Sequence, residues 1–388
     1  MRADISSVQV VPRIITESSG PSHSVPNLCR ALTRQNVQVE LHLLEPTVLS
    51  ADQEYTVSKW RAQRYPGAFR LGHSPAMMAG LRTAALKADL VHGHSLWMLP
   101  NIYASRAARF AGKKFVLSPR GTLSEWALKR SSFLKGCVGR MGQYRAIFSA
   151  DMIHATSDQE LAEVRSFGYQ GPVCVVPNGV AVPDADCRPA GSEFRSRKPS
   201  LVYLSRIHPK KGLDLLLEVW PSLRQRFPDW ELNIAGPLDS AYAMELKAKA
   251  EQGGAEGVSF LGEVLGREKL ELLGGASVFV LPSYSENFGI AVAEALANAV
   301  PVVVSDKTPW GGVISKACGR VAATNASSLE GALIELMALS DADRAVMGQR
   351  GRQWMLDEFA WDAVGGKMRD AYNWLCRSAE LPEFVVLD

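Results

Sequence analysis

The residues with the clearest chemical potential in this 388-residue chain lie between Leu281 and Ala297, in the segment LPSYSENFGIAVAEALA. A short apolar run ends there in a polar loop, and Gly289 opens a stretch with helical spacing. The first N–H groups of a helix lack intrahelical partners and attract anions, and a glycine lets a ligand approach the main chain closely. The segment therefore predicts a phosphate-binding helix start.

Two carboxylates flank this helix start, because Glu286 precedes Gly289 and Glu294 follows it inside the apolar string IAVAEALA. Eight helical residues turn about 80° beyond two full circles, so both carboxylates could face one crevice. Carboxylate oxygens accept hydrogen bonds from the vicinal hydroxyls of ribose or hexose. The alternative is a surface helix with two solvated glutamates. Burial of Glu294 without a partner would be costly, which favours a binding role.

A basic loop in the same half of the chain supplies candidate partners. The segment LVYLSRIHPKKGL reads as a strand that ends at Ser205, followed by Arg206 and Lys211 before the next helix. A guanidinium and an ammonium at one strand end can bracket a diphosphate and neutralise a leaving group. Taken alone, the lysines of this loop could equally be ordinary surface residues.

The elements that must position these residues form a repeated pattern of β-branched apolar runs and helical stretches. Such alternation indicates βαβ units with right-handed crossovers and a parallel sheet, and it occurs twice. The predicted strands are Val8–Val11, Val37–Leu44, Leu90–His92, Phe115–Ser118, Met152–Ala155, Val173–Val176, Ser200–Ser205, Glu231–Ala235, Val258–Leu261, Val278–Pro282 and Val300–Ser305.

The same pattern predicts an α/β fold with two domains, residues 1–195 and 196–388, joined by a linker at about 177–198 that is rich in Pro, Gly, Asp and Ser. Residues 354–381 read as a final helix that could pack back on the first domain. Parallel α/β sheets bind ligands at the carboxyl ends of their strands.

Composition excludes several classes of protein. With 47% hydrophobic residues and a net charge of +3, the chain is not an intrinsically disordered tail. It contains no GxGxxG and no GxxxxGK[ST], which disfavours dinucleotide oxidoreductases and P-loop ATPases. Six scattered cysteines without a CxxC pair support neither a zinc knot nor a disulfide framework. No run approaches the roughly 18 apolar residues of a membrane span.

The combination of Glu286 and Glu294, Arg206 and Lys211, and an early loop GPSHSVPNL starting at Gly20 resembles the retaining GT-B glycosyltransferases of family four, the glycosyl transferases group 1. The resemblance extends over essentially the whole chain. It continues in VPVVVSD, TPW and CG of the second half, and the first-half motifs HGHSLW and SPRGTLSEW resemble a subgroup active in cell-surface polysaccharide assembly.

The resemblance implies two Rossmann-like doubly wound domains facing a central cleft, with the acceptor bound by the first and a nucleotide sugar by the second. It implies that Arg206 and Lys211 contact the diphosphate, Glu294 the ribose, and Glu286 the transferred sugar. The further implied contacts are backbone amides at Asn287, Phe288 and Gly289, loops near the base at Gly236 and Val264, and close approach to the phosphates at Gly20.

In the first domain, many family members place a histidine where this chain has Arg120, in SPRG. His94 and Arg120 are therefore expected to contact the donor sugar or the acceptor, and the alternative for His92 is a core histidine. Retention in this family is usually explained by the diphosphate helping to deprotonate the acceptor on the same face, so neither a metal nor another cofactor is expected. His92 and His94 lack a third metal ligand.

Between Trp126 and Phe148, apolar side chains alternate with five basic residues, and the later part predicts a basic amphipathic helix after a polar break at Ser131 and Ser132. Such a helix suits an anionic membrane surface, although a solvated helix face is the alternative. Nucleic acid is disfavoured because recognised binding motifs are missing.

The sequence thus leads us to expect a retaining hexosyltransferase that uses a GDP- or UDP-linked sugar and a glycan acceptor, lipid-linked, in bacterial surface polysaccharide or lipopolysaccharide biosynthesis. The expected location is cytoplasmic, with peripheral association at the inner face of the membrane. Two alternatives remain open: a nucleotide-sugar 2-epimerase, and a non-catalytic subunit that binds a nucleotide sugar.

Overall fold

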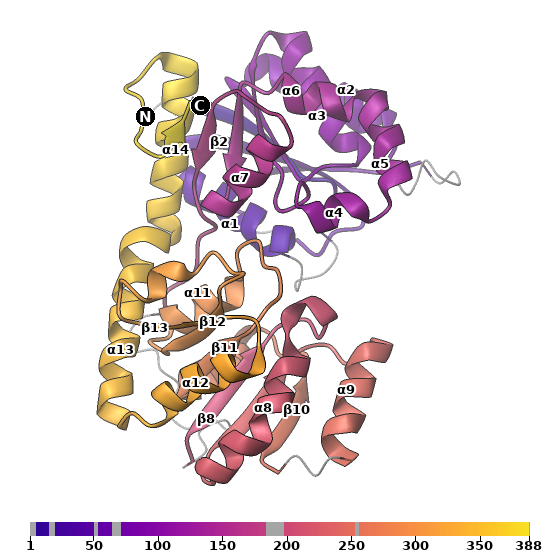
Figure 1. The fold of residues 1–388 in the computed structure, drawn as a ribbon. Coiled ribbons are helices and arrows are strands. Elements are labelled where there is room, and N and C mark those ends of the chain that lie inside the picture. Colours follow the sequence, from indigo (N-terminus) through magenta and orange to yellow (C-terminus); the bar gives the residue numbers. More distant parts are fainter. Residues whose placement is uncertain are drawn as a thin grey trace. The chain divides into compact units, whose positions relative to one another are not determined.

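The computed structural model describes residues 5–14, 20–49, 53–63, 71–183, 198–252 and 256–387. The chain divides into two compact units (Figure 1). Unit 1 combines Met1–Gly179 with Trp361–Asp388, and unit 2 is Val180–Ala360. The second unit begins ahead of the expected boundary at residue 195, and most of the expected linker lies outside the described residues.

Unit 1 is built on an eight-stranded sheet in the order β14-β7-β6-β5-β4-β1-β2-β3. All neighbours pair in parallel except β14, which is antiparallel to β7. Chain order reverses direction between β1 and β4, which makes their carboxyl ends a topological switch point. The strands are β1 (Ile5–Val10), β2 (Val37–Leu44), β3 (Thr56–Trp60), β4 (Leu90–His94), β5 (Lys114–Ser118), β6 (Met152–Ala155), β7 (Val173–Val175) and β14 (Val385–Val386).

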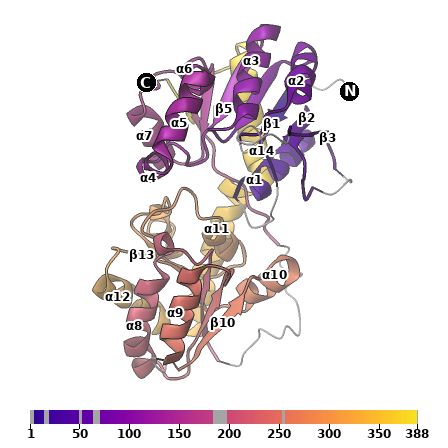
Figure 2. The same cartoon turned by 90° about the vertical axis from the view of Figure 1, so that its right-hand side faces the viewer.

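Helices cover both faces of this sheet, and a separate apolar cluster fills each side. On one side α1 (Gly20–Arg34) and α14 (Trp361–Arg377) lie side by side (Figure 2). On the other side α2 (Pro75–Lys87) and α3 (Leu99–Ala111) pack together, and α7 is Asp158–Ser166. Two buried faces explain why the strands read as nearly continuous apolar runs.

The C-terminal segment expected as one helix over 354–381 is divided between the two units. The helix α13 (Asp341–Trp354) and a π-helical turn, Met355–Phe359, belong to unit 2, and α14 begins at Trp361 in unit 1. Buried Val364, Met368 and Tyr372 follow a helical period along α14 and pack in the cluster that includes α1.

The early GPSHSVPNL segment was expected to be a loop, and this expectation is wrong, because α1 begins at Gly20 and includes the whole segment. Proline is tolerated in the first turn of a helix, where its missing N–H would have no partner, so Pro21 does not oppose this start. Pro26 also lies inside the helix.

Unit 2 contains a six-stranded parallel sheet in the order β10-β9-β8-β11-β12-β13. Its chain order reverses between β8 and β11, which is the switch point of this unit. The strands are β8 (Ser200–Leu204), β9 (Glu231–Ala235), β10 (Val258–Gly262), β11 (Val278–Leu281), β12 (Val302–Ser305) and β13 (Gly319–Ala322), and the helices besides α13 are α8 (Leu213–Arg226), α9 (Ala241–Gln252), α10 (Gly266–Gly275), α11 (Ile290–Ala297) and α12 (Ala326–Met337).

The basic stretch predicted as an amphipathic helix is instead broken into short pieces. After α4 (Glu125–Lys129) come α5 (Ser132–Val138), a π-helical turn at Gly139–Gln143, and α6 (Tyr144–Phe148). The break has a local cause, because Gly142 adopts a φ of 141°, which residues with a side chain rarely adopt. Among the described residues, no helix is long and apolar enough to cross a membrane.

Candidate active site

The switch point of unit 2 brings together two of the predicted site residues. Lys211 follows β8, Glu286 follows β11, and the Lys211 ammonium forms an ion pair with Glu286 Oε2. The side chains are 15% and 12% exposed, so the pair is largely removed from water without being sealed off. The second carboxylate oxygen of Glu286 accepts a hydrogen bond from the Asn287 amide at 3.0 Å.

Close main-chain packing holds these loops in place. An added Cβ on Gly212, whose φ is +67°, would lie 2.0 Å from the Pro282 carbonyl oxygen. The Tyr284 amide donates to the Lys210 carbonyl at 2.7 Å, which joins the two loops a second time. Only glycine fits this approach, so the position of Lys211 relative to Glu286 is set by the backbone.

A similar approach occurs after β9. A Cβ on Gly236 would lie 2.0 Å from the Ser205 carbonyl oxygen, next to the exposed Arg206. Among the described residues, the Arg206 guanidinium has no hydrogen-bond or ion-pair partner, so it is available to an anion at this edge of the sheet. Val264 is 6% exposed and packs in the core of unit 2, which leaves only its main chain for a contact with a ligand.

The start of α11 is rigidly supported. Gly289 caps the helix in the left-handed conformation with a φ of 77°. Phe288 is buried against Trp310 and Phe359, and the Trp310 indole N–H donates to the Phe288 carbonyl. The first amides of α11 are therefore presented at a fixed place beside Glu286.

Glu294 has a partner that the sequence did not reveal. Its Oε1 lies 2.6 Å from the Lys269 Nζ of α10, and the side chains are 14% and 23% exposed. The need for a partner followed from the apolar surroundings of Glu294, but Lys269 carries no motif and only the packing of α10 on α11 identifies it.

Unit 1 has a polar cluster at its own switch point, on the carboxyl ends of β4, β5 and β6. His154 Nε2 lies 2.8 Å from the Val176 carbonyl, which can only accept, so Nε2 carries the proton. His154 Nδ1 then accepts from the Ser118 hydroxyl at 2.7 Å. The Ser118 oxygen accepts in turn from His92 Nε2 at 2.7 Å, and His92 Nδ1 accepts from the Tyr372 hydroxyl at 2.6 Å.

The chain of hydrogen bonds continues to the predicted site residues. The Gln9 amide nitrogen donates to the Tyr372 oxygen at 3.1 Å, and His94 Nε2 donates to Gln9 Oε1 at 2.8 Å. His94 Nδ1 therefore accepts from the Arg120 guanidinium, whose nitrogens lie 3.3 Å away. The guanidinium can only donate and the Val176 carbonyl can only accept, so both ends impose the same direction.

Arg120 is the outer end of this cluster. Its Nη1 donates to Ser24 Oγ of α1 and to Asn178 Oδ1, both at 2.8 Å, and its backbone has a left-handed φ of 54°. Burial lowers the pKa of Arg120 to about 10, so the guanidinium stays charged at neutral pH. His94 is fully buried and acts on anything outside the unit only through Arg120.

The three histidines of the cluster are neutral. Burial is the main cause that lowers the pKa of His92 and of His94 well below the usual value, and it lowers the pKa of His154 to about 3. His92 is a core histidine, as the alternative interpretation of the sequence had it. Within the described ranges, no group of three or more His, Cys, Asp or Glu side chains is arranged to hold a metal ion.

Family comparisons agree with the division of the chain. The model described as "Glycosyl transferases group 1" matches residues 188–354, and the "Glycosyl transferase 4-like domain" matches residues 19–179. The chain belongs to the group 1 glycosyltransferases. As expected from the resemblance, it is therefore a glycosyltransferase.

Two relatives of this glycosyltransferase act on lipid-linked substrates by name. It is 28% identical over 344 residues to a GDP-mannose-dependent alpha-(1-6)-phosphatidylinositol monomannoside mannosyltransferase of Mycolicibacterium smegmatis, covering 82% of this chain and 85% of that one. It is 26% identical to a GDP-mannose:cellobiosyl-diphosphopolyprenol alpha-mannosyltransferase of Xanthomonas campestris, covering 80% and 79%. HepE of Anabaena, solved with UDP and glucose, matches with a TM-score of 0.74 at 16% identity, covering 95% and 99%. The glycosyltransferase has the GT-B fold, as predicted.

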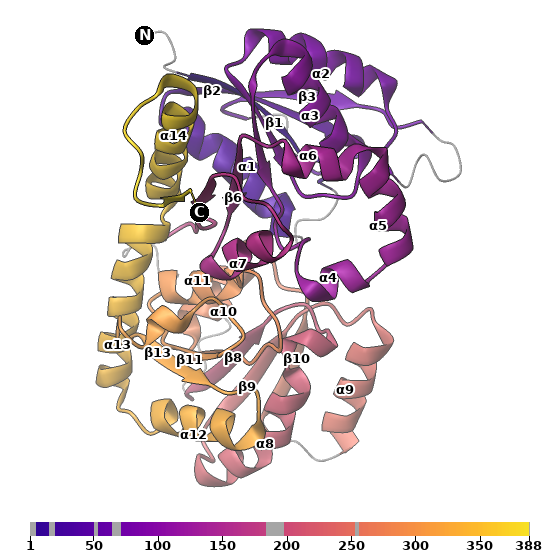
Figure 3. The same ribbon diagram turned by 45° about the horizontal axis from the view of Figure 1, so that its top comes forward.

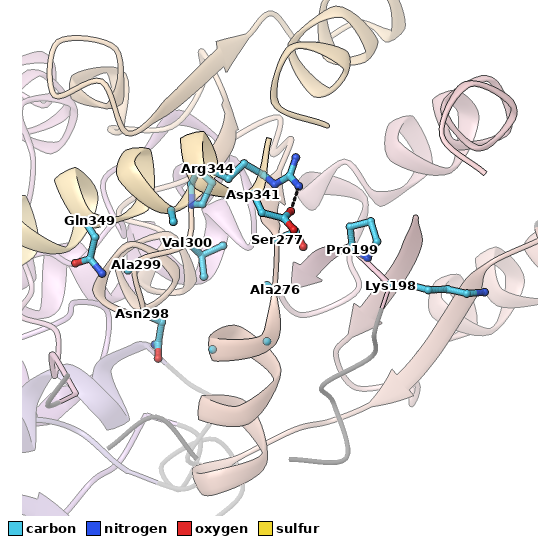
Figure 4. Close-up of a pocket in the computed structure, with 14 residues that line it drawn as sticks. Lys198, Pro199, Ala276, Ser277, Asn298, Ala299, Val300, Asp341, Arg344 and Gln349 are labelled. Carbon is cyan, nitrogen blue, oxygen red and sulfur yellow. Dashed lines mark hydrogen bonds and ion pairs between the residues drawn. The ribbon is translucent and has the colours of Figure 1, made fainter. Parts of the chain in front are cut away.

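A hollow of about 410 Å³ in the glycosyltransferase lies at the opposite, amino edge of the unit 2 sheet (Figure 4). Arg344 is the prominent charge there, but it is already paired with Asp341 and donates to the carbonyls of α12 and of Leu339. Lys198 points away from this pair. Saturated charges at the amino ends of the strands do not make a donor site, so the carboxyl edge is the better candidate.

Proposed function

We propose that this glycosyltransferase moves a hexosyl group, with retention, from a GDP- or UDP-linked sugar to a lipid-linked glycan in bacterial surface polysaccharide biosynthesis. The observation that carries the proposal is the partly exposed ion pair of Lys211 and Glu286 at the switch point of unit 2. A cation and a carboxylate side by side match a donor that joins an anionic diphosphate to a polyhydroxylated sugar.

Each group of the pair has capacity left for a ligand. An ammonium has three N–H donors, and Glu286 uses one of those of Lys211. The remaining donors, with the free guanidinium of Arg206 and the amides at the start of α11, suit the oxygens of a diphosphate. Glu286, held in place by Lys211 and the Asn287 amide, suits hydroxyls of the transferred hexose.

The second ion pair suits the nucleoside. Glu294 keeps one carboxylate oxygen besides the one that contacts Lys269 and can accept from ribose hydroxyls. The main chain at Gly236 and Val264 follows the neighbouring strands β9 and β10 and would contact the base. We propose that Asn287, Phe288 and Gly289 act through their amides.

The proposed reaction needs no protein nucleophile, metal or other cofactor. The bond between the anomeric carbon and the diphosphate oxygen breaks, and a bond to the acceptor oxygen forms on the same face of the sugar. The acceptor proton passes to the departing diphosphate oxygen. Lys211 and Arg206 stabilise the negative charge that develops on the leaving group, and positioning supplies the rest of the acceleration.

We assign the acceptor to unit 1, where Arg120 is a fixed cation at a topological switch point. Acidic or phosphorylated acceptors would gain most from it. The printed names of the relatives, which include phosphatidylinositol and diphosphopolyprenol, support a lipid-linked acceptor. Because a lipid-linked acceptor lies in a membrane, we also propose that the enzyme is cytoplasmic and associates with the inner face of the membrane through the basic surface of residues 126–148.

The donor assignment is tested by thermal-shift screening of GDP, UDP and dTDP and their sugars, since a ligand stabilises the state that it binds. With the donor thus identified, we expect Lys211→Ala and Glu294→Ala each to lower transfer at least about 100-fold. Lys249→Ala, an exposed lysine of α9 paired with Glu245, is the matched control and should leave transfer unchanged. Full activity of both site variants would refute the assignment.

Two further measurements separate the alternatives. An NMR assignment of the anomeric configuration in the product tests retention directly. An epimerase would alter the donor or release free nucleotide without any acceptor, whereas the proposed transferase requires one. A non-catalytic subunit would bind the nucleotide sugar and catalyse neither transfer nor epimerisation.

A further inference from the structure

Unit 1 carries a second concentration of positive charge, away from Arg120. A hollow of about 330 Å³ lies between α3 and the segment formed by the π-helical turn and α6. Four arginines line it, two from α3 and two from the turn and α6: Arg106, Arg109, Arg140 and Arg145. These elements lie beside one another in unit 1 (Figure 3).

The arginines of the hollow are not neutralised by the protein. All four are exposed, and among the described residues none forms an ion pair. Arg106 donates one hydrogen bond, at 3.1 Å, to the Met141 carbonyl. Other cations nearby are paired, such as Lys129 with Glu125 at 2.7 Å and Lys114 with Asp151 at 3.0 Å. Four like charges around one hollow repel one another unless an anion enters it.

The break in the basic stretch creates this hollow. A continuous helix would separate the residues of the turn from α3, whereas the left-handed Gly142 brings the main chain onto Ile102 and Arg106. A Cβ on Gly142 would lie 3.1 Å from Ile102 Cγ2 and 3.5 Å from Arg106 Nη2. The arrangement is therefore built by the backbone and does not depend on mobile side chains alone.

Large exposed apolar side chains lie on the elements that form the hollow and on the adjoining α5, and of these Met141 lines the hollow itself. Phe110 follows Arg109 on α3 and is 60% exposed, and Met141 and Phe148 are each about half exposed. Phe133, on the adjoining α5, is 86% exposed. Unpaired arginines beside exposed aromatic and apolar residues are the composition expected of a surface that enters the headgroup region of a bilayer.

We propose that this hollow binds the phosphate group of an anionic phospholipid while the exposed apolar side chains of the same surface, Met141 and Phe133 among them, enter the leaflet. Guanidinium groups bind phosphate oxygens through paired N–H donors, and a hollow of this size admits a phosphoglycerol headgroup. The occupant is a membrane lipid because the exposed Met141 and Phe133 side chains would gain nothing from a soluble phosphate. The inference rests on the membrane association proposed above and is independent of the donor site.

The experiment is flotation of the full chain with vesicles of phosphatidylcholine alone or with phosphatidylglycerol. We expect binding only to the anionic vesicles, reduced about 30-fold in the double variant Arg140→Gln, Arg145→Gln, at roughly 1 kcal/mol per cation. The control Lys129→Gln, Arg130→Gln removes the same charge from the same segment outside the hollow and should lower binding less than about threefold. Unfolding midpoints verify that all variants are folded.

Three results would overturn the inference. Equal losses in the two double variants would mean diffuse attraction rather than a site. Release from vesicles by a few millimolar inorganic phosphate at constant ionic strength would identify a site for soluble phosphate. Unchanged flotation of Phe133→Ser would show that the exposed apolar side chains of this surface do not enter the leaflet. Transfer to a detergent-soluble acceptor, measured in parallel, should be the same in all these variants, and its absence from the unaltered enzyme would refute the proposed function alone.

Discussion

The two switch points of this glycosyltransferase hold their polar groups in opposite ways. In unit 2 two lysine–carboxylate pairs are between 12% and 23% exposed, and Arg206 at the same edge of the sheet is exposed and has no partner among the described residues. In unit 1 the groups are neutral histidines, hydroxyls and an amide, fully buried and joined in one direction, and their chain of hydrogen bonds starts at the Arg120 guanidinium. The first arrangement can exchange its partners with a ligand, whereas the second can only hold one residue in place.

The difference lies in what each site needs before a ligand arrives. In the absence of a ligand, the ion pair means that neither Lys211 nor Glu286 is an unpaired charge in a poorly hydrated loop. A bound diphosphate and sugar would then replace these interactions. A buried network must be completely satisfied within the protein, since any missing partner leaves a desolvated polar atom. Both follow from the same strand-end position, and their chemistry differs because their exposure differs.

Acidification should produce the largest difference in stability between the two units. His92, His94 and His154 have lowered pKa values, so below pH 6.5 the unfolded chain binds protons that the folded one does not, and stability falls as the pH drops from about 6.5 toward the folded values. The slope should approach about 4 kcal/mol per pH unit, at roughly 1.4 per histidine. Hydrogen exchange resolved by peptide should show unit 1 opening first.

Unit 2 is the internal reference for this measurement, because it has a single histidine, His208. If at pH 5 the amides of both units, corrected for the intrinsic exchange rate, lost protection together, the buried neutral cluster would not be the cause.

Gly212→Ala should disrupt the charged site next most strongly. The added Cβ would meet the Pro282 carbonyl at a positive φ, so we expect a loss of about 2–4 kcal/mol in the free energy of unfolding and weaker binding of nucleotide. Gly331→Ala, in α12 with open space around it, is the control and should stabilise by about 0.5–1 kcal/mol. Urea unfolding measures both, and equal effects would contradict the steric explanation.

Tyr372→Phe should have the smallest effect on stability and the most specific one on activity. It removes the donor to His92 Nδ1 and the acceptor of Gln9, which we expect to cost about 1–2 kcal/mol of stability. Because Gln9 orients His94, and His94 orients Arg120, kcat/KM for the acceptor should also fall.

Tyr169→Phe provides a matched control for this variant. Tyr169 is also buried in unit 1, and its hydroxyl donates to the Ala150 carbonyl at 2.9 Å, outside the network. A similar loss of stability without a change in kcat/KM is expected. If both variants lowered kcat/KM equally, positioning of Arg120 through the network would be refuted.

Local sequence patterns could predict the elements whose structure depends on their own residues. Val37–Leu44, Met152–Ala155 and Glu231–Ala235 were predicted with the bounds that the structure has, because apolar side chains recur along each of them at the spacing of a strand with a buried face. The helix start at Gly289 followed from a glycine between a polar loop and an apolar helix. The strands β3 and β13 were missed, since their residues are mixed in polarity.

The parts that could not be predicted depend on contacts between distant segments. Nothing in the local sequence pairs Glu294 with Lys269, or places Tyr372 against His92 across 280 residues. After Trp126 the spacing of apolar residues fits a helix, but the main chain departs from helical geometry at Gly142. The spacing of apolar residues carries no information about the φ angle of a single glycine, so this break could not be predicted.

One consequence follows from the way in which unit 1 is divided in the chain. Seven of its eight strands and most of its helices precede Gly179, but Tyr372 arrives only with α14, and β14 follows that helix. During translation, therefore, Gln9 and His92 lack their partner Tyr372 until all of unit 2 has been synthesised, and the buried network cannot form before then. Unit 2 is one uninterrupted segment and can finish folding first, so the half of the enzyme that is made first is the half that matures last.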